Sequence, residues 1–273
     1  MKQKSSKKLL STSLLLVLIA LVSLTAATTA WMTIADSTRL KTMRLDVTSG
    51  ANLRFDLDSH ETFEEYVKSL RLIDIADRIL RDQGYHPREN PLSPVTTTDC
   101  IHFTLENGEP AATESYMEFV LHFMATDDMV VHLTTAGEEG TRIFSDEVSD
   151  IAKAMRISFT ADDSTAVYDP GMEPGSEEGL GGKIFGLARG NRIVYDASNT
   201  LFFLKAGVDK PVTVRIWLEG TDEICTDALR GVPYHIQLRF VGTDENGNLL
   251  KDSRTTTRRS AAATPTEERN ENK

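Results

Sequence analysis

The sequence lacks the local motifs that identify the commonest classes of hydrolase and metalloprotease. Neither His-Glu-x-x-His nor Gly-x-Ser-x-Gly occurs in its 273 residues, which excludes the zincin arrangement and the nucleophile elbow. The segment Gly179-Leu-Gly-Gly-Lys183 shares letters with a phosphate-binding loop. It lacks the upstream glycine and the Ser or Thr after the lysine, so we interpret it as a turn. These absences favour a protein without catalytic machinery and with no cofactor.

Cysteine is scarce as well. Cys100 and Cys225 are the only two, and no Cys-x-x-Cys is present, which excludes a zinc ribbon and a dithiol redox motif. In an oxidising compartment the two could form one disulfide that closes a long loop and contributes about 4 kcal/mol. Two unpaired, buried thiols fit the spacing equally well, so both alternatives stay open.

Basic residues are outnumbered. The chain has 30 Lys and Arg against 41 Asp and Glu, a formal net charge of −11 at pH 7. Nucleic-acid binding requires clustered positive charge, so this balance argues against a nucleic-acid partner. It suits a soluble protein that meets cations or a basic partner.

The first thirty residues have the layout of a secretory signal. Four lysines precede an apolar stretch at 9–24, and small residues follow at 25–30. Thr28 and Ala30 fit the two pockets of a signal peptidase, which predicts cleavage before Trp31. Alternatively the segment is retained as a single membrane anchor, since about 20 apolar residues span a bilayer. The lysines would then stay in the cytoplasm, so the body lies outside the membrane in both cases.

Alternating apolar and polar residues predict a series of short strands. We expect the first two to form a hairpin through Ser49-Gly-Ala-Asn52, and the third and fourth to form another through residues 125–128. The predicted strands lie at residues 43–47, 53–57, 116–124, 129–134, 156–160, 201–205, 212–218 and 235–241.

Helical spacing appears at 61–83, where Gly84 is placed to end the helix, and more briefly at 146–155. Residues 161–182 are rich in Gly, Pro and Glu and predict a loop. The pattern predicts a mainly β fold, a jelly roll or β-sandwich with one or two inserted helices. We expect one domain over 31–252, preceded by the signal or transmembrane helix at 1–30 and followed by a disordered tail at 253–273.

Three groups of residues could bind a ligand, but a structural role explains each of them more simply. His122 and His132 lie on the two strands of the second predicted hairpin, but a register with Met124 opposite Met129 places their rings on opposite faces, which disfavours a metal site. Trp217 on a strand is more often core than a carbohydrate platform. Five acidic residues lie near a predicted helix start, where the helix dipole stabilises negative charge. This interpretation is favoured over a calcium site. The last group comprises Asp56, Asp58, Glu61, Glu64 and Glu65.

Two segments resemble a known family. The signal ending Ala27-Thr-Thr-Ala30-Trp31-Met-Thr33 resembles that of SipW-dependent secreted proteins of Gram-positive bacteria, with Met32 where Phe is usual. The segment Pro211-Val-Thr-Val-Arg-Ile-Trp-Leu-Glu-Gly-Thr-Asp222 resembles the strand that many proteins with such signals carry. The organisation is similar to the TasA/camelysin group. The helix at 61–83 and the segment at 161–182 depart from that pattern.

The resemblance implies a jelly-roll protein exported by a dedicated signal peptidase, with some members building extracellular or biofilm fibres by donating an N-terminal strand to a neighbour. Carried over, the donor is the segment from Trp31 to residue 47, with Met43, Leu45 and Val47 along its strand. A strand of its own domain is the plainer reading of the same residues. We therefore expect a non-catalytic cell-surface or matrix protein that acts in assembly or adhesion, with itself or a wall or matrix component as partner. A membrane-anchored binding or accessory module, or a hydrolase with dispersed carboxylates, is the alternative.

Overall fold

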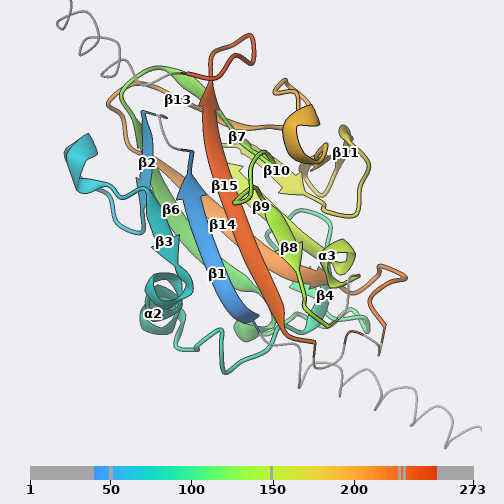
Figure 1. Cartoon of the computed structure of the whole chain (residues 1–273). Coiled ribbons are helices and arrows are strands. Elements are labelled where there is room, and N and C mark those ends of the chain that lie inside the picture. Colours follow the sequence, from blue (N-terminus) through green and yellow to red (C-terminus); the bar gives the residue numbers. More distant parts are fainter. Residues whose placement is uncertain (1–39, 49–51, 148–149, 227–228, 230–231, 251–273) are drawn as a thin grey trace, which may run out of the picture.

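The computed structural model describes residues 40–48, 52–147, 150–226, 229 and 232–250. This part of the chain is mainly β, with two sheets and two α-helices (Figure 1). None of its helices is both long and apolar enough to cross a bilayer. The signal or anchor at 1–30, with Thr28, Ala30 and Trp31, and the tail at 253–273 lie outside the described residues.

The elements follow one another in a chain of short strands. The α-helices are α2 (Leu72–Gln83) and α3 (Ile151–Ala154), and the 3-10 helices are η1 (Phe63–Glu65), η2 (Thr113–Ser115) and η3 (Gly190–Arg192). The strands are β1 (Leu40–Val47), β2 (Leu53–Asp56), β3 (Ser69–Arg71), β4 (Pro94–Thr97), β5 (Phe103–Thr104), β6 (Met117–Ala125), β7 (Met129–Leu133), β8 (Arg142–Phe144), β9 (Met155–Ala161), β10 (Ser164–Tyr168), β11 (Gly175–Gly179), β12 (Gly182–Gly186), β13 (Thr200–Leu204), β14 (Lys210–Glu219) and β15 (Tyr234–Thr243).

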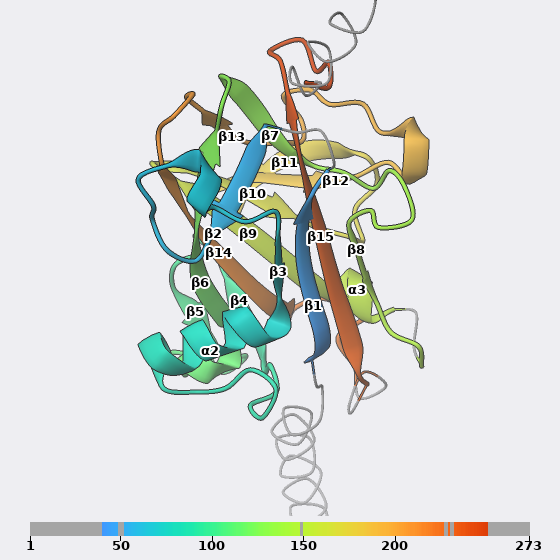
Figure 2. The ribbon, with the colours of Figure 1, turned by 60° about the vertical axis from the view of Figure 1, so that its left-hand side comes forward.

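Two mixed sheets contain these strands. The first has the order β13-β7-β15-β1-β3, and β8 pairs with the part of β15 that β7 leaves free. The second runs β2-β6-β14-β9-β10-β12-β11, and β4 extends it at the end of β14. Figures 1 and 2 show the sheets face to face, with α2 at one end.

The main core lies between the sheets. Phe240 of β15 meets the rings of Phe55, Phe123 and Phe159 from the second sheet, at centroid distances of 5.7, 5.2 and 5.9 Å. All four side chains are fully buried. Each aromatic residue buries a large apolar area, so this cluster joins the sheets more strongly than any single backbone contact.

Both predicted hairpins are wrong, although their strands are present. β1 lies in the first sheet and β2 in the second, where β2 pairs with β6. In the same way β6 belongs to the second sheet and β7 to the first. Alternation identifies a half-buried strand but not its neighbour, and a short connection crosses between two stacked sheets as readily as it reverses a strand.

The helix predicted at 61–83 is confirmed only over its second half. Before Leu72 the chain forms η1 and β3 instead. The Arg54 guanidinium donates to the carbonyls of Phe63, Glu64 and Tyr66 at 3.2, 2.9 and 3.2 Å, and β3 pairs with β1. Gly84 ends the helix in the left-handed region at φ 80°, as predicted.

The loop predicted at 161–182 is also wrong, since it contains β10, β11 and the start of β12. Glycine makes this possible: a Cβ at Gly182 would lie 2.1 Å from the carbonyl oxygen of Thr165 on the neighbouring strand. Leu180 and Gly181 both have positive φ and form the tight turn between β11 and β12. The interpretation of the glycine-rich segment as a turn is therefore confirmed.

Candidate functional site

The segment that carries the family resemblance, residues 211–222, forms β14 and the turn after it. Val214 and Ile216 face the main core, and Trp217 on the other face is fully buried against Phe103 at a ring distance of 5.4 Å. The indole nitrogen of Trp217 donates to Glu219 at 3.0 Å. The interpretation of Trp217 as a core residue is confirmed, and the segment has a structural role.

A mostly buried ion triad fixes the end of the same segment. Arg156 of β9 lies 3.0 Å from Asp169 and 2.9 Å from Asp222, and the three side chains are 13, 14 and 18% exposed. Burial raises the pKa of Asp169 even though the guanidinium opposes that shift. One guanidinium therefore bridges both carboxylates and ties the end of β10 to the turn after β14.

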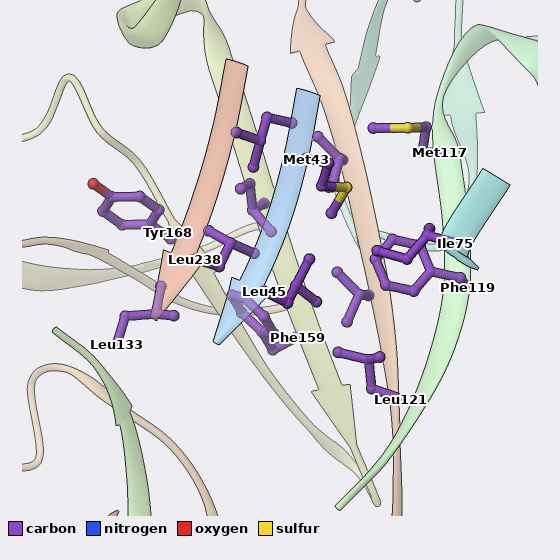
Figure 3. Packing of buried hydrophobic residues seen from close by; sticks show 14 of the residues in the cluster. Met43, Leu45, Ile75, Met117, Phe119, Leu121, Leu133, Phe159, Tyr168 and Leu238 are labelled. Carbon is purple, nitrogen blue, oxygen red and sulfur yellow. The ribbon is translucent and has the colours of Figure 1, made fainter. Parts of the chain in front are cut away.

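β1 lies between β15 and the short edge strand β3 of the first sheet, and its inward side chains fill the core. Met43, Leu45 and Val47 are 2, 0 and 7% exposed. Figure 3 shows Leu45 among buried side chains that include Leu238 of β15 and Phe159 of β9. Removing the strand would open an apolar slot along the length of the sandwich.

The pairing of β1 is unusual in direction. It runs parallel to β15 from Leu40 to Val47, and antiparallel to β3 over Arg44–Asp46 only. A strand parallel to its neighbour cannot be joined to it by a tight turn, so no hairpin ties β1 into this position. It is also the first strand of the described chain.

The two histidines considered for a metal site lie in different sheets. His122 on β6 meets Asp209 at 2.9 Å, while His132 on β7 is buried and bonded to Asn199 and Thr243. Burial lowers the pKa of His132. Within the described residues no group of three or more His, Cys, Asp or Glu side chains is placed to hold a metal ion.

Asp209 is a centre that sequence reasoning missed. Tyr66 donates to one carboxylate oxygen at 2.8 Å, and Ser59 and His122 meet the other at 2.9 Å each. Burial raises the pKa of Asp209, but these bonds outweigh it and bring the pKa below its ordinary value. Ser59 bonds the carboxylate instead of the imidazole, so this is not a nucleophilic Ser-His-Asp arrangement. The cluster fastens the loops around Ser59 and Asp209 to β6.

Three of the five acidic residues at 56–65 contact neighbouring side chains. Asp58 pairs with Arg78, Asp56 lies 3.3 Å from His60, and Glu65 accepts hydrogen bonds from Thr62 at 3.0 and 2.9 Å. Asp56, Asp58 and Glu65 thus have partners within the protein.

Cys100 and Cys225 are both free thiols. Cys100 is fully buried in the small cluster beneath Trp217, and Cys225 lies at the margin of the main core. Burial raises the pKa of each to about 11. The structure therefore has the two unpaired thiols and not the disulfide.

A cleft of about 970 Å³ lies beside β13, the outer strand of the first sheet. On its wall the ammonium of Lys183 donates to the carbonyl oxygens of Ala197 and Thr200, at 2.7 and 2.8 Å. Phe203 and Val208 expose 46 and 49% of their surface there. Asp162 in the same cleft is paired with Lys210 at 2.6 Å. The described lining combines apolar side chains with charged groups, some paired and some unpaired, and presents no recognisable catalytic constellation.

Comparison with known protein families, with characterised proteins and with solved structures found no significant match to this chain.

Proposed function

We propose that this protein is an exported, non-catalytic β-protein that assembles on the cell surface or in the extracellular matrix by exchanging β1 between copies. The observation that carries the proposal is the position of β1. It is the first strand of the described chain, it carries core residues, it is covered by β3 over only part of its length, and no hairpin holds it.

Exchange of such a strand costs little at equilibrium. A neighbour's β1 would make the same contacts with β15 and β3 as the chain's own, so the closed and exchanged forms differ mainly in the connection to β2. That connection runs from Val47 to Leu53 and passes from one sheet to the other. The apolar slot then strongly favours being filled, by either copy.

The strand order supports a jelly roll as the underlying fold. Numbering β1, β6, β7, β9, β10, β13, β14 and β15 from one to eight, the sheets read 1-8-3-6 and 2-7-4-5, which is the order of an eight-stranded jelly roll. Neighbours in that fold are antiparallel, whereas β1 is parallel to β15. The reversed strand is the one proposed as the donor.

Export is supported by the signal-like start of the sequence. Cleavage by a signal peptidase before Trp31 would free the segment that leads into β1. If the signal is retained, it would anchor the domain at the outer face of the cell membrane. Free release suits assembly in a matrix, and retention suits an accessory module at the cell surface.

A disulfide between β1 and β15 tests the exchange. Arg44 and Gln237 lie opposite each other, so the double variant Arg44→Cys, Gln237→Cys can form a bond wherever β1 sits beside β15. We expect covalent multimers on non-reducing denaturing gels, because the two cysteines come from different chains.

The matched control is Thr160→Cys, Thr165→Cys, a pair on β9 and β10 whose hydroxyls lie 3.1 Å apart. It should close within one chain and migrate as a monomer. If the β1–β15 pair also gives only monomers, β1 stays in its own domain and the exchange is rejected.

A further inference from the structure

A groove of about 410 Å³ lies beside β1, and all the ionisable residues that line it are positively charged. The four cations are Lys41, Arg44, Arg71 and Arg88, and all are exposed. Of these four side chains, only that of Arg44 has an ion pair within the described part of the chain, with Asp46 and Glu139. The backbone N–H of Arg71 donates to Asp74 at 2.9 Å, but its guanidinium has no ion pair there. On a chain with a net charge of −11, this concentration of unpaired cations marks a surface for an anionic partner.

The groove also contains unpaired strand edge. β3 covers β1 only at Arg44–Asp46, and the chain then turns into α2 at Leu72. The half of β1 from Leu40 to Met43 is therefore paired on one side only, with β15, within the described part of the chain. An open edge of this kind accepts an additional strand through backbone hydrogen bonds.

An acidic strand at the far edge of the second sheet has the complementary properties. β11 pairs only with β12 in the described structure, and Ser176, Glu177 and Glu178 along it are exposed. Neither glutamate has an ion pair within 4 Å among the described residues. Charge on an edge strand ordinarily keeps copies apart, unless the partner surface carries the opposite charge.

We infer that the cationic groove beside β1 receives the acidic edge strand β11 of a second copy of this chain. The strand would extend the first sheet where β3 ends, with Glu177 and Glu178 meeting cations of the groove. The inference rests on the proposed assembly and adds the contact that docks one copy against the next before β1 is exchanged.

The two surfaces lie toward opposite ends of the molecule. Figures 1 and 2 place β11 in the upper half of the sandwich, and α2 with the adjoining end of β1 at the bottom. A contact between two different surfaces is heterologous, and it propagates into a ring or a filament instead of stopping at a dimer. This geometry is what an assembling matrix protein requires.

Charge reversal tests the contact on the full chain, purified as its host processes it. The groove variant is Lys41→Glu, Arg71→Glu, and the strand variant is Glu177→Lys, Glu178→Lys. Matched controls are Lys68→Glu and Glu106→Lys, which are exposed and lie outside both surfaces. Assembly rate and particle size are followed by light scattering, and circular dichroism verifies that each variant is folded.

We expect either variant alone to assemble about tenfold more slowly or worse, because like charges then face each other. The controls should assemble like the unmodified chain. The chain that carries all four substitutions should assemble with itself again, since the charges are complementary once more, and should fail to co-assemble with the unmodified chain.

Two results overturn the inference: groove and strand variants that assemble normally, or a four-fold variant that stays as slow as its parents. A groove variant that assembles normally but loses binding to polyphosphate assigns the groove to a free polymer and overturns it too. An unmodified chain that never associates removes the proposed function itself, which separates the two failures.

Discussion

At the scale of single residues, the guanidinium of Arg156 pairs with two carboxylates at the ends of β10 and β14. Without it the negatively charged Asp169 and Asp222 would repel each other, since both lie within 3.0 Å of the same guanidinium. Breaking a buried ion pair by removing one partner costs more than the pair contributes, since the remaining charges stay buried.

The substitution Arg156→Met should therefore destabilise the protein by about 3–5 kcal/mol in urea unfolding. Arg81→Met is the control, because Arg81 pairs with Asp82 at an exposed position and should change stability by less than about 1 kcal/mol. Equal, small effects of the two substitutions would contradict the structural role of the triad.

Asp209 predicts a stability change in acid. Its pKa is lower in the folded protein than the ordinary value of 3.8, so its stabilising effect is complete above that value and is lost as the pH falls through the folded pKa. Urea unfolding at pH 5 and at pH 3 should give a smaller difference for Asp209→Asn than for the unmodified chain. An identical difference would show that Asp209 contributes nothing to acid sensitivity.

The burial of the two cysteines predicts that their thiols react slowly with thiol-specific reagents. With pKa values raised to about 11, Cys100 and Cys225 are almost wholly protonated at pH 7.5 and react slowly. A thiol-reactive dye should label neither within the time that labels both in 6 M guanidinium chloride. Rapid labelling of the folded protein would contradict the burial of these residues.

At the scale of elements, the positions of most strands could be predicted because inward and outward residues alternate along them. Their partners could not: β1 and β2 are close in sequence but belong to different sheets, and β1 pairs with β15 from the far end of the chain. Parallel and inter-sheet pairings leave no local signal.

The residues of the candidate site, too, could be predicted only in part. Met43, Leu45 and Val47 could be placed on one strand from their spacing, since they share its inward face. The cationic groove could not be predicted, because Lys41, Arg71 and Arg88 meet only after β3 and α2 fold against β1. Asp209 was missed for the same reason, as its partners come from distant strands and loops.

The core role of β1 predicts a large effect of a small change. Leu45→Ala should lower the free energy of unfolding by about 2–5 kcal/mol, because Leu45 is fully buried and leaves a cavity. Val120→Ala on β6 is the control, since Val120 is 37% exposed and should cost about 0.5 kcal/mol or less. A negligible loss at Leu45 would show that β1 does not belong to the folded core.

At the scale of the whole molecule, the chain has a net charge of −11, and its described part includes a cationic groove and an acidic free edge far from it. Such a polar arrangement orients approaching copies, and its effect weakens as salt screens the charges beyond about 10 Å at 0.1 M ionic strength. Strand exchange through β1 does not depend on charge and would hold the copies together once they have docked.

Intact mass together with size-exclusion light scattering, on protein released from the native surface, tests assembly most directly. The proposal predicts an intact mass that matches a chain starting at Trp31, because cleavage frees the segment before β1. It also predicts large, heterogeneous particles, because strand exchange can continue from one copy to the next. A full-length chain that is soluble only in detergent and runs as a monomer would contradict it, and would identify an anchored domain that works alone.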